Sequence, residues 1–395
     1  MAHVTFNKKE MIDAEILTKA REKYREFISS SRVNGHSFLF TANSEPSPYA
    51  RCFAVFGYHL LREDLSNQAD MLAEHIQTDL NLLRKTKMQD SVDILYDKPY
   101  LQLLTFSLSS LFLLNKLGEF SLQDHIEPLL KRIQIEKYLK MVGALKGKPG
   151  SGNFAMFVAI LLIYGKRMGL NTPLIEEWED LHIRSTNATG FWGTGDMSHL
   201  KFQNGYHQYE IFEYNECDRI DWELVARNVA SLVDDEGHFA PYPGGGGCYD
   251  YDAIFILTSK HHIAKNYIHV LERSVRSILD SQNLDGGFCE SVNVRPRNIK
   301  NLGKFLKHIR DGNTLSVRKE RLRRAVTLQR IKHDRIHTHW SKYSRKWSES
   351  NLWDSWFRML AIARVITAID DNHHKQWGFI DFPGIGYNRD AFEVR

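Results

Sequence analysis

The chain has 395 residues, of which 43% are hydrophobic and 25% are charged, and its net charge is +4. These values are typical of a globular protein with a large core, and they exclude a low-complexity or disordered chain. The first residues lack the apolar segment of a secretion signal, and no uncharged apolar run reaches the about 18 residues that span a membrane. A cytoplasmic protein is therefore expected.

Helices of two kinds alternate along the chain. Amphipathic helices are predicted at 68–86 and 221–235, where apolar residues recur at i, i+3, i+4 and i+7. The segments 103–118 and 155–169 are apolar on nearly every side, which is typical of helices buried all round, and both end at a glycine soon after a basic residue. Strand signals are sparse, so an all-α fold is predicted.

A repeat of about 50 residues organises these helices. Four similar turns place a glycine shortly before a phenylalanine, and their spacings are 48, 49 and 91 residues, the last close to two periods: Phe191, Phe239, Phe288 and Phe379. Polar or proline-rich segments lead into apolar helices at the same spacing, near residues 44, 96, 147, 204, 247 and 350. Each period therefore predicts one helical hairpin with an apolar inner helix and an amphipathic outer helix.

Six or seven such hairpins in a chain of this length predict a closed α/α toroid. In that architecture the N-termini of the inner helices gather at one rim, around a central cavity. We expect residues 1–40 to form an N-terminal helical segment and residues 41–395 to form a single toroid domain.

The doubled interval contains a basic insertion at about 294–347. Its 17 Lys and Arg against three Asp and Glu give it a charge of +14, in a chain whose net charge is +4. Such a segment is typical of an anion-binding surface, with Arg321, Arg323, Arg324 and Arg330 at or beside the cavity mouth, or of a solvated basic face. The chain has no zinc-finger, helix-turn-helix or RNA-binding signature, so specific nucleic-acid recognition is not expected.

Two acids follow a run of four glycines in PYPGGGGCYDYDAIFIL, residues 241–257. At the start of an inner helix, Asp250 and Asp252 either cap free N–H groups or place one carboxyl in the cavity. Burial there would raise the carboxyl pKa and keep the proton in place. Because the two acids are i and i+2, only one needs to face inward. We expect Asp252 to project into the cavity, with Asp250 capping or supporting it.

Two of these segments resemble a known superfamily. QNLDGGFCE at 282–290 resembles the glutamine and aspartate-glycine-glycine-aromatic turn of terpenoid cyclases and protein prenyltransferase β subunits. CYDYDAIFIL resembles the Asp-x-Asp-Asp helix start of class II terpene cyclases, in which the second Asp donates a proton. The resemblance implies an α/α toroid with Asp252 as the donor, although Ala253 stands where the third acid would be.

Other residues near predicted inner-helix starts are candidates for the cavity wall. His207, Glu210 and Tyr214 can share one helix face, so His207 and Glu210 are further catalytic candidates; a solvent-exposed polar face is the alternative. Six aromatic residues are candidates for stacking on a sugar or facing a carbocation, with core packing as the alternative: Tyr206, Tyr249, Tyr251, Trp192, Trp353 and Trp356.

Two classes of enzyme fit these residues. The first is a terpenoid-cyclase-like or prenyltransferase-like isomerase or lyase, in which Asp252 is the general acid on an isoprenoid or lipid-like, phosphate-bearing substrate. The second is a glycan-active α/α-barrel enzyme, a lyase, hydrolase or epimerase, acting on an anionic saccharide. A toroid that only binds a partner is the third reading.

The chain lacks a P-loop, a dinucleotide fingerprint and a nucleophile elbow, so nucleotide hydrolysis, redox chemistry with NAD and serine hydrolysis are excluded. No cofactor is expected. The four cysteines contain no CxxC pair, so neither a zinc knuckle nor disulfides are expected. A metal held by His333, His337 and His339, together with Cys248 or Asp250, is the alternative.

Overall fold

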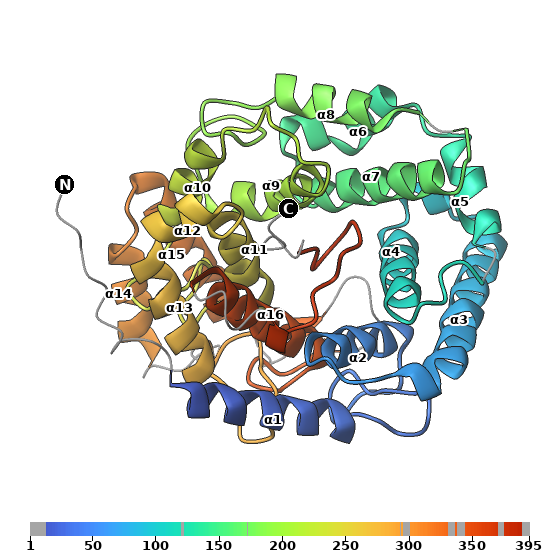
Figure 1. Cartoon of the computed structure of the whole chain (residues 1–395). Helices are drawn as coiled ribbons and strands as arrows, with labels where there is room; N and C mark the ends of the chain where they lie inside the picture. The colour runs from blue at the N-terminus through green and yellow to red at the C-terminus, as the bar shows by residue number, and fades with distance from the viewer. Residues whose placement is uncertain are drawn as a thin grey trace.

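The structure, a computed structural model, describes residues 13–119, 122–171, 173–292, 294, 301–330, 336–337, 344–369 and 375–388. Within these residues the fold is all-α, as predicted, and its 16 α-helices form a toroid (Figure 1). The strands in the described residues are short: β1 (Ile336–His337) pairs antiparallel with β2 (Ser344–Arg345). No helix in the described part of the chain combines the length and the apolar character that crossing a bilayer requires.

Six helices form the inner ring (Figure 1). In ring order they are α2 (Pro48–Leu60), α4 (Lys98–Leu113), α7 (Ser151–Arg167), α9 (His199–Tyr214), α11 (Gly247–Leu257) and α16 (Leu352–Ile369). Each packs against the next, and α16 packs against α2, so the ring is closed. α4 and α7 are buried over most of their length, which explains why their sequences are apolar on nearly every side.

The outer helices precede their inner partners in the chain. They are α1 (Ala14–Ser30), α3 (Ala69–Gln89), α5 (Gln123–Leu130), α6 (Ile135–Val142), α8 (Ile175–Arg184), α10 (Trp222–Ala230), α12 (His261–Asn266) and α13 (Ile268–Asp280). α1 packs against both α2 and α16, so it is the outer helix of the first hairpin. The described residues therefore form six hairpins, within the predicted range.

The turns between outer and inner helices repeat a backbone hydrogen bond that fixes their register. The N–H groups of Asn187, Asp234 and Asn283 each donate to the carbonyl of the residue four positions later, at 2.8–2.9 Å. In the first turn that carbonyl belongs to Phe191, so Trp192 is the residue equivalent to the phenylalanines of the other two turns. The predicted equivalence of Phe191 is wrong by one residue, because two aromatic residues are adjacent there.

Phe379 does not belong to this series. It follows α16 instead of leading into an inner helix, and its carbonyl contacts His59 Nε2 at 3.0 Å, near the C-terminal end of α2. Its turn therefore lies at the end of the ring opposite to the other turns, and its predicted equivalence to them is wrong.

The described part of the basic insertion is built on α14 (Leu302–Arg310) and α15 (Leu315–Arg330), which pack on each other. An apolar cluster that includes Tyr242, Phe305 and Trp347 joins them to the ring. The Glu320 carboxylate accepts hydrogen bonds from the N–H groups of His199 at 2.7 Å and Leu200 at 2.8 Å, at the start of α9. The insertion therefore lies at the rim where the inner helices begin.

After α16, residues 375–388 return into the ring (Figure 1). The Gly378 N–H donates to the Leu60 carbonyl at 3.0 Å, at the end of α2. Further along, the Gly386 N–H donates to Glu210 Oε1 at 3.1 Å, in the second half of α9. This C-terminal segment thus crosses the ring at the end opposite to the rim.

Candidate functional site

A cavity of about 680 Å³ lies at the rim of the toroid. The first turns of α4, α7, α9, α11 and α16 supply most of its wall, and α15 covers one side. Exposed residues such as Leu200 and Arg323 mark its mouth, and Ile385 of the C-terminal segment lies at its floor. The inner-helix starts therefore meet around one cavity.

Asp252 lines this cavity from the second turn of α11. Its side chain is 1% exposed, and neither carboxylate oxygen has a hydrogen-bond partner among the described residues. Burial raises the pKa of this carboxyl well above its usual value, and the nearby carboxylates of Glu210 and Asp250 raise it further. Burial therefore favours the neutral, protonated form of Asp252, and this residue lines an open cavity.

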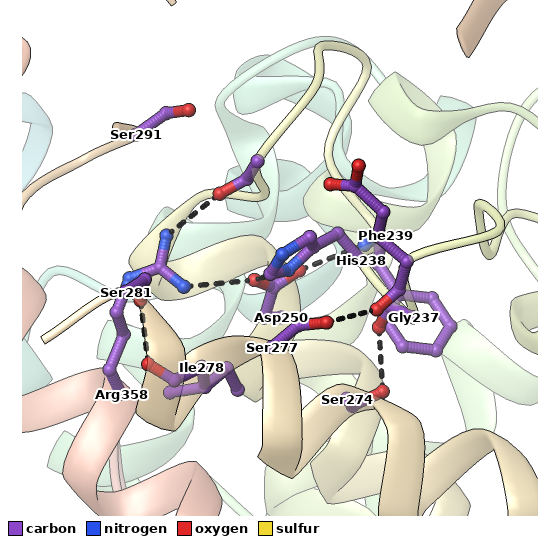
Figure 2. Close-up of polar contacts among 12 residues, drawn as sticks. Gly237, His238, Phe239, Asp250, Ser274, Ser277, Ile278, Ser281, Ser291 and Arg358 are labelled. Atoms are coloured by element: carbon purple, nitrogen blue, oxygen red, sulfur yellow. Dashed lines mark hydrogen bonds and ion pairs between the residues drawn. The ribbon is translucent and has the colours of Figure 1, made fainter. Parts of the chain in front are cut away.

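Asp250 does not line the cavity and instead joins neighbouring turns (Figure 2). Its Oδ1 accepts the Phe239 N–H at 2.8 Å, and its Oδ2 accepts from His238 Nδ1 at 2.8 Å and from Arg358 Nη1 at 3.2 Å. α11 begins after Gly246 and has no side-chain cap. Of the two roles expected for Asp250, capping and supporting, the structure therefore shows the second.

Three glycines before α11, at 244–246, let the chain pass over this buried ion pair. Gly245 has a φ of +71°, and a Cβ at this position would overlap the Asp250 carboxylate and the His238 ring. A glycine is therefore required here by both backbone conformation and space. The turn then delivers Cys248 and Tyr249 to the cavity wall.

The two catalytic candidates on α9 lie at different depths. His207 lines the cavity, and its Nε2 is hydrogen-bonded to the amide nitrogen of Asn153 on α7. Burial lowers the His207 pKa to about 3, so the ring is neutral. Glu210 lies outside the cavity lining, next to Gly386 of the C-terminal segment, and burial raises its pKa to about 8. The structure brings His207, but not Glu210, to the cavity.

Half of the aromatic candidates line the cavity: Tyr206, Tyr249 and Trp353. The other half are buried in the core and do not line it: Tyr251, Trp192 and Trp356. Trp192 Nε1 donates to the His182 carbonyl at 2.9 Å, and the Trp356 ring lies 5.4 Å from that of Phe53. Core packing is therefore the correct reading for this second group.

The arginines of the insertion also divide into two groups. Arg323 and Arg324 line the cavity, whereas Arg330 does not. Arg321 was expected at the mouth, but it is 1% exposed and donates to the His308 carbonyl at 2.7 Å. It lies on the helix face that packs against the ring, so it anchors α15 and is not available to a ligand.

Four charged residues of the cavity were not predicted: Glu290, Lys98, Glu320 and Arg345. Glu290 Oε2 pairs with Arg345 Nη2 at 2.9 Å, and its Oε1 accepts from the Tyr242 hydroxyl. Burial and then the neighbouring Asp354 raise the pKa of Glu290. Lys98 is the first residue of α4, and burial lowers its pKa to about 8. Its place at the start of an inner helix is the sequence signal that identifies it.

The described residues contain no group of three His, Cys, Asp or Glu side chains placed to hold a metal ion. His333 and His339 lie outside the described residues, and so does the side chain of His337. All four cysteines are free thiols, and Cys248 is the one that lines the cavity.

No family model and no curated protein matches the chain in sequence. Among solved structures, the type II terpene cyclase MstE from Scytonema is similar with a TM-score of 0.49 and 11% identity, over 91% of this chain and 99% of that one. A glycosidase variant in complex with glucose has a TM-score of 0.48 and 11% identity, over 90% and 99%. A variant of MstE with bound geranylgeranyl dihydroxybenzoate has a TM-score of 0.44 and 11% identity, over 90% and 98%. These similarities are remote.

Proposed function

We propose that the chain is an enzyme in which Asp252 is the general acid. The supporting observation is that Asp252 lines the cavity with a buried carboxyl that has no described protein partner, and that burial favours its neutral form. A buried polar group without a hydrogen bond is unfavourable in a folded protein. A substrate atom in the cavity would supply the missing partner and would receive the proton.

The raised pKa of Asp252 suits the protonation of an oxygen atom. A carboxyl with a raised pKa keeps its proton at neutral pH, but it is a weaker acid than an ordinary carboxyl. An oxygen that leaves a bond becomes basic as that bond breaks, whereas an isolated alkene remains a very weak base. Acid catalysis at a glycosidic or ester oxygen is therefore the reaction that this carboxyl supports best.

The cavity wall favours a polar, anionic substrate. Four side-chain amides that can bind hydroxyl groups line it: Gln102, Asn153, Gln203 and Asn204. Arg323 and Arg324 add positive charge at the mouth. Glu290 supplies a second carboxyl, as acid-catalysed glycoside hydrolysis requires. An anionic saccharide is therefore the preferred substrate class, and the reaction is a hydrolysis, elimination or epimerisation.

An isoprenoid or lipid-like substrate that bears a phosphate is the second candidate. The rings of Tyr206, Trp353 and Phe357 also line the cavity, and aromatic faces stabilise a nearby cation. In this reading Asp252 would protonate the hydrocarbon, and the arginines of α15 would hold the phosphate.

The test is turnover of two substrate panels, one of uronate-bearing or phosphate-bearing oligosaccharides and one of prenyl diphosphates, followed by mass spectrometry. Asp252→Asn keeps the shape and removes the donated proton, so kcat should fall about 10²–10⁴-fold. Asp235→Asn is the matched control, because Asp235 is exposed and lies outside the cavity lining. Normal turnover by Asp252→Asn would show that another group is the acid.

A further inference from the structure

Lys98 places a positive charge in the cavity that no carboxylate in the described residues neutralises. The adjacent Asp97 is engaged elsewhere, because its carboxylate accepts from Lys87 Nζ at 2.9 Å and from the Tyr100 N–H at 2.8 Å. No hydrogen bond or ion pair joins the Lys98 amine to another described side chain. Lys98 and His207 line the same cavity, and the charge of Lys98 lowers the pKa of His207.

His207 presents a second donor at this place. An amide nitrogen can only donate, so the bond from Asn153 makes Nε2 of the imidazole an acceptor. The neutral ring then carries its hydrogen on Nδ1. That atom is buried and has no partner among the described residues. Lys98 and His207 thus line one cavity, and the Lys98 ammonium and the His207 Nδ1–H both lack a partner among the described residues.

We propose that Lys98 and His207 form a subsite that binds an anionic group of the substrate: a phosphate, a sulfate or a carboxylate. This inference deepens the proposed function, because it rests on the cavity being the substrate site. A bound anion would compensate for the desolvation of the Lys98 ammonium group by an ion pair and charged hydrogen bonds. It would also accept the hydrogen bond of the imidazole.

A lysine gives this subsite a pH dependence that the arginines at the mouth cannot give. The pKa of Lys98 is about 8, so the empty subsite loses its charge as the pH rises through that value. An arginine stays protonated throughout this range. Anion affinity should therefore fall between about pH 7 and about pH 9.5 if Lys98 binds the anion.

Equilibrium dialysis of the full chain with radiolabelled sulfate, at constant ionic strength, tests the proposal. Sulfate remains a dianion over this pH range, so any titration belongs to the protein. Lys98→Met should weaken binding at about pH 7 by about 10–100-fold, the usual effect of losing a charged hydrogen bond. Lys98→Arg should keep the binding and lose its fall at high pH. Lys137→Met is the matched control, because Lys137 is exposed and remote from the cavity lining, and it should bind as the wild type does.

Sulfate binding that is unchanged in Lys98→Met, or that disappears on replacing Arg323 and Arg324 alone, would overturn the proposal. A fall with pH that persists in Lys98→Arg would do the same. The result is independent of the acid assignment, because sulfate binding requires no turnover and Asp252→Asn should retain it. An inactive Asp252→Asn with no Lys98-dependent binding would therefore reject this subsite and keep the general acid.

Discussion

At the scale of single residues, Asp250 and Asp252 show how position on a helix decides the state of a carboxyl. Both begin α11 and both are buried, with exposures of 0% and 1%. Asp250 meets Arg358, His238 and a backbone N–H, so its charge is compensated. Asp252 meets none of these, so burial favours its neutral form. Two residues along one helix thus separate a carboxyl that is paired with Arg358 and His238 from one whose neutral form burial favours.

This difference predicts a stability effect of Asp252→Asn. Above about pH 4 an unfolded chain releases the Asp252 proton, whereas the folded chain keeps it. The folded state then binds more protons, so the wild-type free energy of unfolding falls as the pH rises from about 4 towards the folded pKa. Asn has no such titration. The stability of Asp252→Asn minus that of the wild type should therefore be larger at about pH 7.5 than at about pH 4.5, as measured by urea midpoints. A difference between the two proteins that is independent of pH would contradict the raised pKa.

The sequence could predict where cavity residues begin, but not which side of each helix faces the cavity. Asp252 and Trp353 were found because they stand near the starts of inner helices. His207 was found because the sequence indicated a start near residue 204, although α9 begins at His199. Trp356 occurs on the same helix start as Trp353 but packs into the core, because residues three apart point about 60° away from each other around an α-helix. Lys98 was missed because a lysine at a helix start is usually solvated, and only the closed ring surrounds it with protein.

At the scale of elements, the turns between outer and inner helices set the spacing of the toroid. Gly286 in the third turn has a φ of +86°, and a Cβ there would overlap the backbone carbonyl of Lys23 on α1. The last hairpin is thereby fixed against the first. The glycine is required by its conformation and by this close approach together.

Gly286→Ala should destabilise the chain more than Gly169→Ala. Both glycines have positive φ, so both substitutions carry the about 1–2 kcal/mol penalty of a left-handed alanine. Nothing lies within 4 Å of a Cβ at Gly169, whereas at Gly286 the backbone of α1 would have to move. Urea denaturation should show a loss for Gly286→Ala that approaches the about 4–5 kcal/mol of the most damaging substitutions. Equal losses would show that α1 yields without strain.

The element pattern was the most predictable level of this molecule. The hairpin period is visible in the inner helices that are apolar on nearly every side, as the sequences of α4 and α7 show. The register of the turns was less predictable, because Phe191 and Trp192 are both aromatic and only the backbone hydrogen bonds distinguish them. Phe379 also follows a glycine, but its turn comes after α16 and leads into no inner helix, so the local sequence pattern was misleading there.

At the scale of the whole molecule, closure distinguishes this ring from an open stack of hairpins. α16 packs against α11 and also against α1 and α2, so the two ends of the described chain share one core. An open repeat array can unfold from its ends, because each unit contacts only its neighbours. Here every inner helix has two inner neighbours.

Unfolding in urea should therefore be one cooperative transition. Far-ultraviolet circular dichroism, which follows all helices, should give the same midpoint as tryptophan fluorescence. A separate early transition in either signal would mean that one group of hairpins unfolds independently of the closure between α16 and α2.

The C-terminal segment gives the molecule one more property. Residues 375–388 lie across the ring from the end of α2 to α9, and Ile385 lies beneath the cavity. Within the described part of the chain, the toroid is therefore a cup and not a tube. If the substrate enters and the product leaves through the same mouth of the cavity, the product must dissociate before the next substrate can bind. Arg323 and Arg324 of α15 lie beside this opening, so both the substrate and the product pass them. A positive charge that speeds the binding of an anionic substrate therefore also slows the release of a product with the same charge.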